Sequence, residues 1–511
     1  MRRARALLPA VIVALAGAFA FREMLRGAEL RVDDASIVAR YAENLVHHGQ
    51  LTWNVGEPPV EGFTGYSLLG VMIIATLLHV SPLSAALALG IVSLGAGAAL
   101  VLRAHEPLGA SPLAGSVAAA LFLGAAEQVT HATSGLETEL FIALTVACAF
   151  IAVSRAHLPP GAGRLWPLPL VATALVFTRP EGLAVAGAFL LVVVIRERAA
   201  LRVWLFWTGL LTVLPVAALQ LFRRIHFGGW LPNTYYAKLG NPGEQGAFAA
   251  SFGEHFQAYF LPAVVAMIAT AIVARALGRP VTPLPAPVKS ARQALLLGAA
   301  PGYLALSWSY LRSDLVMGYS DRFAFHLFGL SSLLFLLAVA EVDRRLRSLR
   351  ESAPAHSATF VLACAALYLP FANAMQRAPK ERAFRDSYAR ATETHLLPTA
   401  RLLKEILPPD ATLAVYPDAG VVPYSTMLRT VDFGKLNDTY LAREATGTAS
   451  VAEYFFDRSP DALMISLRAG LARTYDEGGD RILSDPRFEP RYRLVRLSLR
   501  DGGGLALFVK R

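Results

Sequence analysis

Two adjacent carboxylates, Asp33 and Asp34, stand in a polar island, residues 31–66, between two strongly apolar stretches of the chain. Ionised groups beside lipid are costly unless they pair or take part in a reaction. An aspartate at the start of a helix caps it by accepting backbone N–H bonds, and helical spacing follows the pair as far as Gly49. One carboxylate suffices for a cap, so the second is a candidate for chemistry.

The rest of the island combines an indole, an amide and two carboxylates within the sequence LTWNVGEPPVEGFTGY. A sugar presents apolar ring faces and hydroxyl edges, and this combination of side chains suits both. Tryptophan is equally common as an anchor at membrane interfaces, so it does not decide between the two roles alone. The candidate sugar-binding side chains of the island are Trp53, Asn54, Glu57 and Glu61.

Basic side chains occupy three further polar loops, which contain the sequences TRPEG, HFGGWLPNTYYAK and DRF. Phosphate is their natural partner, because arginine binds it through paired hydrogen bonds and lysine offers a point charge. Two arginines also have a structural alternative, since Glu181 and Asp321 stand close enough in the sequence to pair with them. The candidate phosphate-binding residues are Arg179, Arg224, Lys238 and Arg322.

The whole chain has the composition of a multi-pass membrane protein, with 511 residues of which 55% are hydrophobic and a mean hydropathy of +0.45. Most apolar runs approach the roughly 20 residues that a helix needs to cross a bilayer. The net charge of +10 does not indicate nucleic-acid binding, because arginines cluster beside apolar runs, as in cytoplasmic loops. Cys148 and Cys364 lie within apolar runs, and no histidine spacing resembles a metal site.

We expect about eleven transmembrane helices. The run 65–82 is ambiguous, because a further crossing there would move every later loop to the other side and leave the basic cluster DRRLRSLR outside. The positive-inside bias favours a helix that lies at, or re-enters, the outer face. The island, the basic motif loops and the C-terminal part then share the extracytoplasmic side. The expected spans are 6–22, 82–102, 112–129, 137–153, 165–178, 181–195, 203–222, 257–274, 293–310, 323–340 and 357–375.

Residues 376–511 differ in composition from the membrane domain, residues 1–375. An amphipathic helix that ends at Pro408-Pro409 is expected first. Short strands follow, and the last two are joined by a glycine-rich turn at 501–504. The expected fold is thus a polytopic α-helical membrane protein with a small C-terminal α/β domain. The expected strands are 411–415, 462–467, 492–500 and 505–511.

The order of these motifs resembles that of integral-membrane glycosyltransferases of the GT-C type, particularly the group around the mycobacterial terminal arabinofuranosyltransferase and its bacterial relatives. Two departures are visible: the sequence after VEGFT is plainer than in the family, and Leu136 stands where relatives carry Met. The matching stretches are Asp33-Asp34-Ala35, RYAENLVHHGQLTWNVGE, VEGFT, SGLETELFIAL, TRPEG, FGGWLPNTYYAK, DRF and AGVVPYSTMLRTVDFGKLND.

The resemblance implies transfer of a sugar from a polyprenyl-phosphate donor to an extracytoplasmic glycan, lipid or protein acceptor at the bacterial cytoplasmic (inner) membrane. It implies that Asp33 is the general base, that Asp34 supports it or caps the helix, and that Arg179 and Lys238 lie near the donor phosphate. It leaves a divalent metal open and implies no other cofactor. The matching motifs add Glu137, Glu181, Asn233 and Tyr236 to the candidate sugar- and acceptor-binding side chains.

A transporter or flippase for a lipid-linked or anionic solute is the alternative from another class of protein. Transporters place ionisable groups and broken helices near the middle of the membrane, often between internal repeats. Here the charged motifs gather in the outer loops and no convincing repeat is found, which favours an enzyme. A non-catalytic assembly protein is a weaker alternative, because both aspartates are present.

Overall fold

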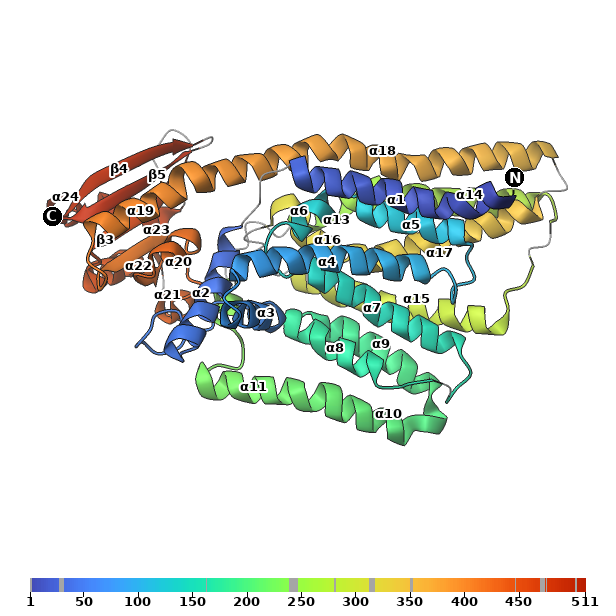
Figure 1. Cartoon of the computed structure of the whole chain (residues 1–511), viewed down its shortest axis with the longest axis horizontal. Helices are drawn as coiled ribbons and strands as arrows, with labels where there is room; N and C mark the ends of the chain where they lie inside the picture. The colour runs from blue at the N-terminus through green and yellow to red at the C-terminus, as the bar shows by residue number, and fades with distance from the viewer. Residues whose placement is uncertain are drawn as a thin grey trace.

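The apolar runs fold into long helices, which satisfy their own backbone hydrogen bonds and so suit a hydrocarbon environment. In the computed structural model these helices lie side by side along one direction, and a small α/β domain lies at one end of the bundle (Figure 1). The structure describes residues 2–26, 32–161, 163–238, 247–279, 282–311, 318–349, 353–445, 447–468, 474, 476–500 and 503–511.

Every predicted span falls on helical segments, although 112–129 and 323–340 each run across a bent pair of helices. The predicted count of eleven crossings is not confirmed. Within the described residues seven helices are long and apolar enough to cross a membrane, or up to nine if each of two bent pairs is one span. The bundle contains α1 (Arg2–Arg26), α4 (Pro82–Arg103), α5 (Pro112–Gly124), α7 (Thr138–His157), α8 (Pro167–Thr178), α9 (Gly182–Arg196), α10 (Leu201–Thr208) to α11 (Leu214–His226), α13 (Ala247–His255) to α14 (Leu261–Ala276), α15 (Ala286–Leu311), α17 (Phe328–Ser348) and α18 (Ala353–Ala391).

The two sets of loops predicted from charge lie at opposite ends of this bundle. Figure 1 shows the polar motif loops at the end that carries the α/β domain, and the arginine-rich connections at the other end. The ambiguous run forms α3 (Tyr66–Leu77), a helix of 12 residues at the domain end, as expected for a helix that does not cross. The other short helices of this end are α2 (Asp33–His48), α6 (Ala126–Ala132), α12 (Asn233–Ala237), η5 (Tyr319–Asp321) and α16 (Arg322–Phe325).

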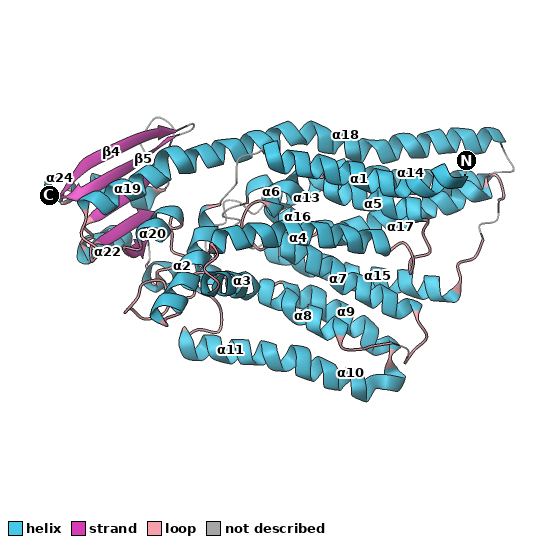
Figure 2. Cartoon of the chain, viewed as in Figure 1, coloured by secondary structure: helices cyan, strands magenta, loops and turns pink. Residues whose placement is uncertain are grey.

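The C-terminal domain contains the predicted strands and one that sequence patterning missed, β2 (Arg429–Asp432). The sheet order is β2-β1-β3-β5-β4; β2, β1 and β3 are parallel, whereas β5 is antiparallel to β3 and β4 (Figure 2). Part of the predicted turn at 501–504 lies outside the described residues. The remaining elements are η6 (Thr392–Leu396), α19 (Leu397–Ile406), β1 (Thr412–Tyr416), α20 (Val421–Thr426), α21 (Thr439–Arg443), α22 (Gly447–Arg458), β3 (Ala462–Arg468), α23 (Glu477–Ser484), α24 (Phe488–Arg491), β4 (Tyr492–Arg500) and β5 (Gly503–Lys510).

The island and the C-terminal domain share one apolar core. Side chains of α2 such as Ile37 and Tyr41 are buried in the same cluster as Leu403 of α19 and Val415 of β1. In addition, α18 passes through the expected domain boundary near residue 376 without interruption, and η6 and α19 continue it to Ile406. The helix bundle and the domain are therefore joined both along the chain and through the island.

Candidate active site

The two aspartates of the island turn to different partners. Successive residues of an α-helix are rotated by about 100°, so adjacent side chains in the first turn of α2 point in different directions. The Asp33 carboxylate faces the C-terminal domain, where it accepts backbone N–H bonds from Gly420 and Val421, each 2.7 Å long. A Cβ atom at Gly420 would meet the Asp33 carbonyl oxygen at 1.9 Å, so only glycine permits this approach.

The expectation that an aspartate caps α2 is wrong. The N-cap residue is Val32, no side chain caps it, and both carboxylates belong to the first turn, where a negative charge favours the helix dipole. Burial, followed by the nearby Asp418 carboxylate, raises the pKa of Asp33 to about 8 against the opposing effect of the Val421 N–H bond. Asp33 therefore acts here as a contact between α2 and the domain.

Asp34 faces a narrow cavity where charged side chains from five separate segments meet. This cavity has about 70 Å³ of free space, well below the roughly 300–1,000 Å³ of ordinary ligand pockets, so it is too small to enclose a whole ligand of that size. The Asp34 carboxylate makes no hydrogen bond or ion pair with any residue that the structure describes. Burial raises its pKa, although Arg322 and Lys238 oppose the effect. The charged side chains that line the cavity are Asp34, Glu137, Arg179, Lys238 and Arg322.

Glu137 organises the two arginines of the cavity. Its Oε1 atom accepts hydrogen bonds from Arg179 at 2.6 Å and from Arg322 at 3.0 Å. A left-handed turn at Gly135 (φ 75°) precedes it and lies against Ala35 of α2, which brings the start of α7 beside the island. Arg179 stands at the tip of the hairpin between α8 and α9 and also binds Glu181, at 3.2 Å. Both guanidinium groups are thus fixed before any ligand arrives.

Lys238 is the third basic side chain of the cavity. Its ammonium group has no hydrogen bond or ion pair among the described residues, and it lies 6.0 Å from the ring centre of Phe323. Burial, together with Arg179 and Arg322, lowers its pKa to about 8. Among the described residues, a carboxylate and an ammonium group that make no hydrogen bond or ion pair therefore face the same cavity as the paired Glu137, Arg179 and Arg322.

Comparison with solved structures identifies the fold. ArnT from Cupriavidus metallidurans bound to undecaprenyl phosphate is 14% identical, with a TM-score of 0.60 over 98% of this chain and 97% of that one. The Archaeoglobus fulgidus oligosaccharyltransferase is 12% identical, with a TM-score of 0.51 over 90% of this chain and 70% of that one. Mycobacterial AftD is 14% identical, with a TM-score of 0.50 over 100% of this chain and 40% of that one.

This chain has the GT-C fold.

Sequence comparisons add less. Residues 383–507 match a family model described as a domain of unknown function, DUF8728, which lies inside the C-terminal part of this GT-C chain. No curated protein sequence matches the chain.

Several residues predicted to bind sugar lie away from the cavity and join the island to the C-terminal domain instead. The Trp53 indole N–H donates to the carbonyl of Thr430 at 3.1 Å, and the Asn54 amide pairs with the same residue's backbone at 2.9 and 3.0 Å. Glu57 forms an ion pair with Arg429. These three side chains reach β2, the strand that sequence patterning missed, because their partners lie in a part of the chain that no local pattern connects to the island.

The remaining predicted residues also have structural partners. Glu61 binds Arg223 at 2.8 Å, and the Asn233 amide donates to the carbonyls of Lys435, Leu436 and Asp438 at 3.0 to 3.1 Å. Tyr236 lies under the guanidinium of Arg443, 4.3 Å from its ring centre. Arg224 is exposed and donates to the carbonyl of Gly228. None of these four lines the cavity.

Sequence reasoning also missed residues of the cavity that carry no charge. Thr234 of α12 and Leu436 of the C-terminal domain line it. The turn PDAGV, residues 417–421, directly follows the buried strand β1 and supplies both backbone N–H groups that bind Asp33. A polar turn after a buried strand is the sequence signal that could have pointed to them. Within the described residues no three His, Cys, Asp or Glu side chains are grouped so as to hold a metal ion.

Proposed function

We propose that the protein is a membrane glycosyltransferase that moves a sugar from a polyprenyl-phosphate donor to a hydroxyl group of an acceptor at the outer face of the membrane. One observation carries the proposal: the Asp34 carboxylate, which makes no hydrogen bond or ion pair among the described residues, shares a cavity with three basic side chains. The GT-C fold agrees with this function, and undecaprenyl phosphate is bound by one protein of the same fold, ArnT.

The proposed reaction assigns each charged group a separate task. The acceptor oxygen attacks the anomeric carbon, the bond from that carbon to the phosphate oxygen breaks, and the acceptor proton passes to Asp34. The departing polyprenyl phosphate gains negative charge, which fixed cationic donors stabilise most effectively when they are oriented in advance. Arg179 and Arg322 are oriented by Glu137, and Lys238 supplies a positive charge that forms no ion pair within the part of the chain that the structure describes. The gathering of these groups at one end of the bundle supports an enzyme over a transporter.

The proposed base differs from the expectation drawn from the family resemblance. That expectation gave Asp33 the proton and Asp34 a supporting role. Both carboxylate oxygens of Asp33 already accept backbone hydrogen bonds, whereas Asp34 has no partner among the described residues. A general base must lie within hydrogen-bond reach of the hydroxyl that it deprotonates. We therefore assign the role of base to Asp34, and we assign to Asp33 the role of holding the C-terminal domain against α2.

The phosphate-binding role is tested by Lys238→Ala and Arg322→Ala. Each variant is expected to weaken binding of undecaprenyl phosphate about 10- to 100-fold, because a hydrogen bond to a charged group contributes about 1.5–3 kcal/mol. Binding of undecaprenol, which lacks the phosphate, should not change. The matched control is Arg224→Ala, since Arg224 is exposed and lies outside the cavity. Equal phosphate affinity in all three variants would remove the proposal.

The pH dependence of kcat/KM is expected to be bell-shaped. The base must be ionised, and the pKa of Asp34 is raised by burial, so activity should appear only above the ordinary aspartate range. Lys238 must be protonated to bind phosphate, and its pKa is lowered to about 8, so activity should fall as the pH rises through that value. In Lys238→Arg the alkaline decline should disappear, because arginine stays charged throughout this range. A steady-state profile from pH 5 to about 10 measures both limbs.

A further inference from the structure

A short strap, residues 319–322, separates the cavity from a second hollow on the α18 side of the bundle. The hollow measures about 390 Å³, and Ser320 and Asp321 of the strap form part of its wall. The next residue, Arg322, lines the cavity on the other side. Adjacent residues of the strap therefore face two different charged environments.

The strap has an unusual backbone. Ser320 (φ 47°, ψ 35°) and Asp321 (φ 55°, ψ 34°) both adopt the left-handed conformation. This region is costly for residues that carry a Cβ atom, and two such residues in succession persist only where the surroundings hold them. The pair directly precedes Arg322, so the conformation sets the direction in which that side chain leaves the backbone.

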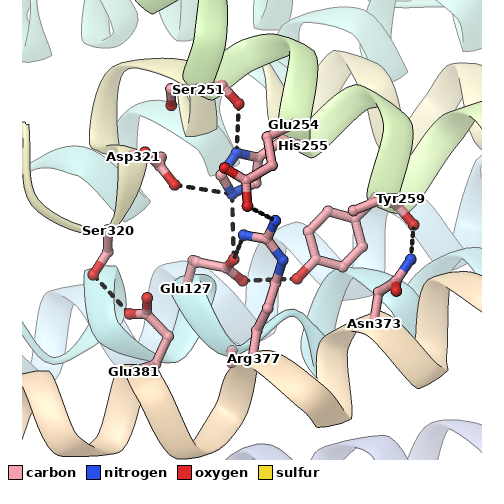
Figure 3. Close-up of polar contacts among 12 residues, drawn as sticks. Glu127, Ser251, Glu254, His255, Tyr259, Ser320, Asp321, Asn373, Arg377 and Glu381 are labelled. Carbon is pink, nitrogen blue, oxygen red and sulfur yellow. Dashed lines mark hydrogen bonds and ion pairs between the residues drawn. The ribbon is translucent and has the colours of Figure 1, made fainter. Parts of the chain in front are cut away.

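A charged cluster on α6, α13 and α18 holds the strap (Figure 3). The Ser320 hydroxyl donates to Glu381 at 2.6 Å, and Glu381 also accepts a bond of 2.7 Å from the Thr130 hydroxyl. The Asp321 carboxylate lies 3.5 Å from Nε2 of His255. The anchoring groups are themselves fixed, since His255 bonds Glu127 at 3.2 Å and Arg377 bonds Glu127 at 3.0 Å.

Aromatic packing fixes the first residue of the strap in the same way. The ring of Tyr319 is stacked on Phe384 of α18, with ring centres 5.7 Å apart and planes inclined by 12°. On the cavity side, Arg322 donates to Thr138 at 2.8 Å and to Glu137 at 3.0 Å. The strap is therefore held at both ends, and its polar partners on the α18 side do not take part in the proposed chemistry.

We infer that this cluster positions Arg322 for the donor phosphate by holding the strap in its left-handed conformation. The inference rests on the proposed function, since it assumes that Arg322 binds phosphate. Ser320, Asp321, Glu381 and His255 are then positioning residues, which act through the backbone and do not touch the substrate. Because α18 continues into the C-terminal domain, the same helix anchors the domain and the phosphate-binding arginine.

Two substitutions at one position separate backbone conformation from side-chain chemistry. Ser320→Gly loses the bond to Glu381 but adopts the left-handed conformation without strain, so its affinity for undecaprenyl phosphate should stay within about threefold of wild type. Ser320→Val loses the bond and disfavours the conformation, so its affinity should fall about tenfold or more, as for loss of a charged hydrogen bond. Ser459→Val is the matched control, because Ser459 is also left-handed (φ 43°) but lies in the distant C-terminal domain.

A double-mutant cycle distinguishes positioning from general destabilisation. Glu381→Leu should weaken undecaprenyl phosphate binding about tenfold, whereas Glu381→Gln, whose amide oxygen still accepts from Ser320, should restore most of it. In an Arg322→Ala background, Glu381→Leu should have no further effect, because coupled residues are non-additive. Additive losses, or equal losses in Ser320→Gly and Ser320→Val, would overturn the inference. Unchanged binding in Arg322→Ala alone would instead remove the proposed phosphate role.

Discussion

Asp34→Asn is expected to lower the rate of sugar transfer about 10²- to 10⁴-fold, the range that a positioned general base contributes. The amide has nearly the same shape as the carboxylate but cannot take the proton of the acceptor hydroxyl. Binding of undecaprenyl phosphate should be unchanged or tighter, because the substitution removes a negative charge from the cavity that contains Lys238 and Arg322. Turnover at saturating donor, measured beside donor affinity, separates the two effects.

The comparison that decides this prediction is Asp33→Asn. The new amide N–H group would face a backbone N–H donor of Gly420 or Val421, so the contact between α2 and the domain should weaken and the melting temperature should fall. The folded fraction should retain most of its turnover. The opposite pattern, full activity in Asp34→Asn and loss of turnover without loss of stability in Asp33→Asn, would return the base to Asp33.

Charge and hydropathy predicted the architecture well, because apolar runs and the basic residues beside them are local properties of the sequence. The apolar runs lie in helices, and within the described residues the arginine-rich connections lie at the end of the bundle opposite the polar motif loops (Figure 1). The short run 65–82 was predicted not to cross the membrane, and it forms α3, a helix of 12 residues at the domain end of the bundle. The number of crossings was harder to predict from the sequence, since α8 and α9, with 12 and 15 residues, are shorter than an isolated spanning helix requires.

The division of labour within the site could not be predicted in the same way. Which of two adjacent carboxylates faces the cavity depends on the rotation of α2, and the partner that fixes this rotation, Gly420, lies 387 residues further along the chain. Trp53 and Asn54 have side chains of the types that bind sugars, yet their hydrogen bonds go to Thr430. Residue type identified the groups capable of chemistry, whereas long-range packing selected the ones that face the cavity.

Joining the island to the C-terminal domain through buried polar groups has a physical consequence for the site. The island carries Asp34, and the domain supplies Leu436 to the same cavity, so the geometry of the cavity depends on how firmly the two are docked. Apolar burial alone is non-directional, whereas hydrogen bonds to fixed carbonyl groups define one orientation. A buried side chain that binds carbonyl groups of both the island and the domain should therefore control both stability and alignment.

Arg40 is that side chain, and Arg40→Met is expected to destabilise the protein by about 3 kcal/mol or more. Its guanidinium is buried and donates to the carbonyls of Trp53, Pro423 and Leu428 at 2.7 to 2.9 Å. Methionine fills a similar volume with an apolar chain, but each buried acceptor left unpaired costs about 1–3 kcal/mol. Burial lowers the pKa of Arg40 to about 10, so the group is charged at neutral pH in the native contact.

The matched control is Arg429→Ala, an arginine in the same contact whose side chain is 55% exposed and paired with Glu57. Exposed ion pairs contribute about 1 kcal/mol or less, so this variant should melt close to the wild type. The fluorescence of Trp53, which is 2% exposed between the island and β2, reports whether the island and the domain stay in contact. The rate of protease cleavage within this contact is a second readout. If Arg40→Met and Arg429→Ala lost the same small amount of stability, apolar burial would suffice to dock the domain. A large loss confined to Arg40→Met, with turnover falling in parallel, would tie the alignment of Asp34 to the bonds that this one buried guanidinium makes.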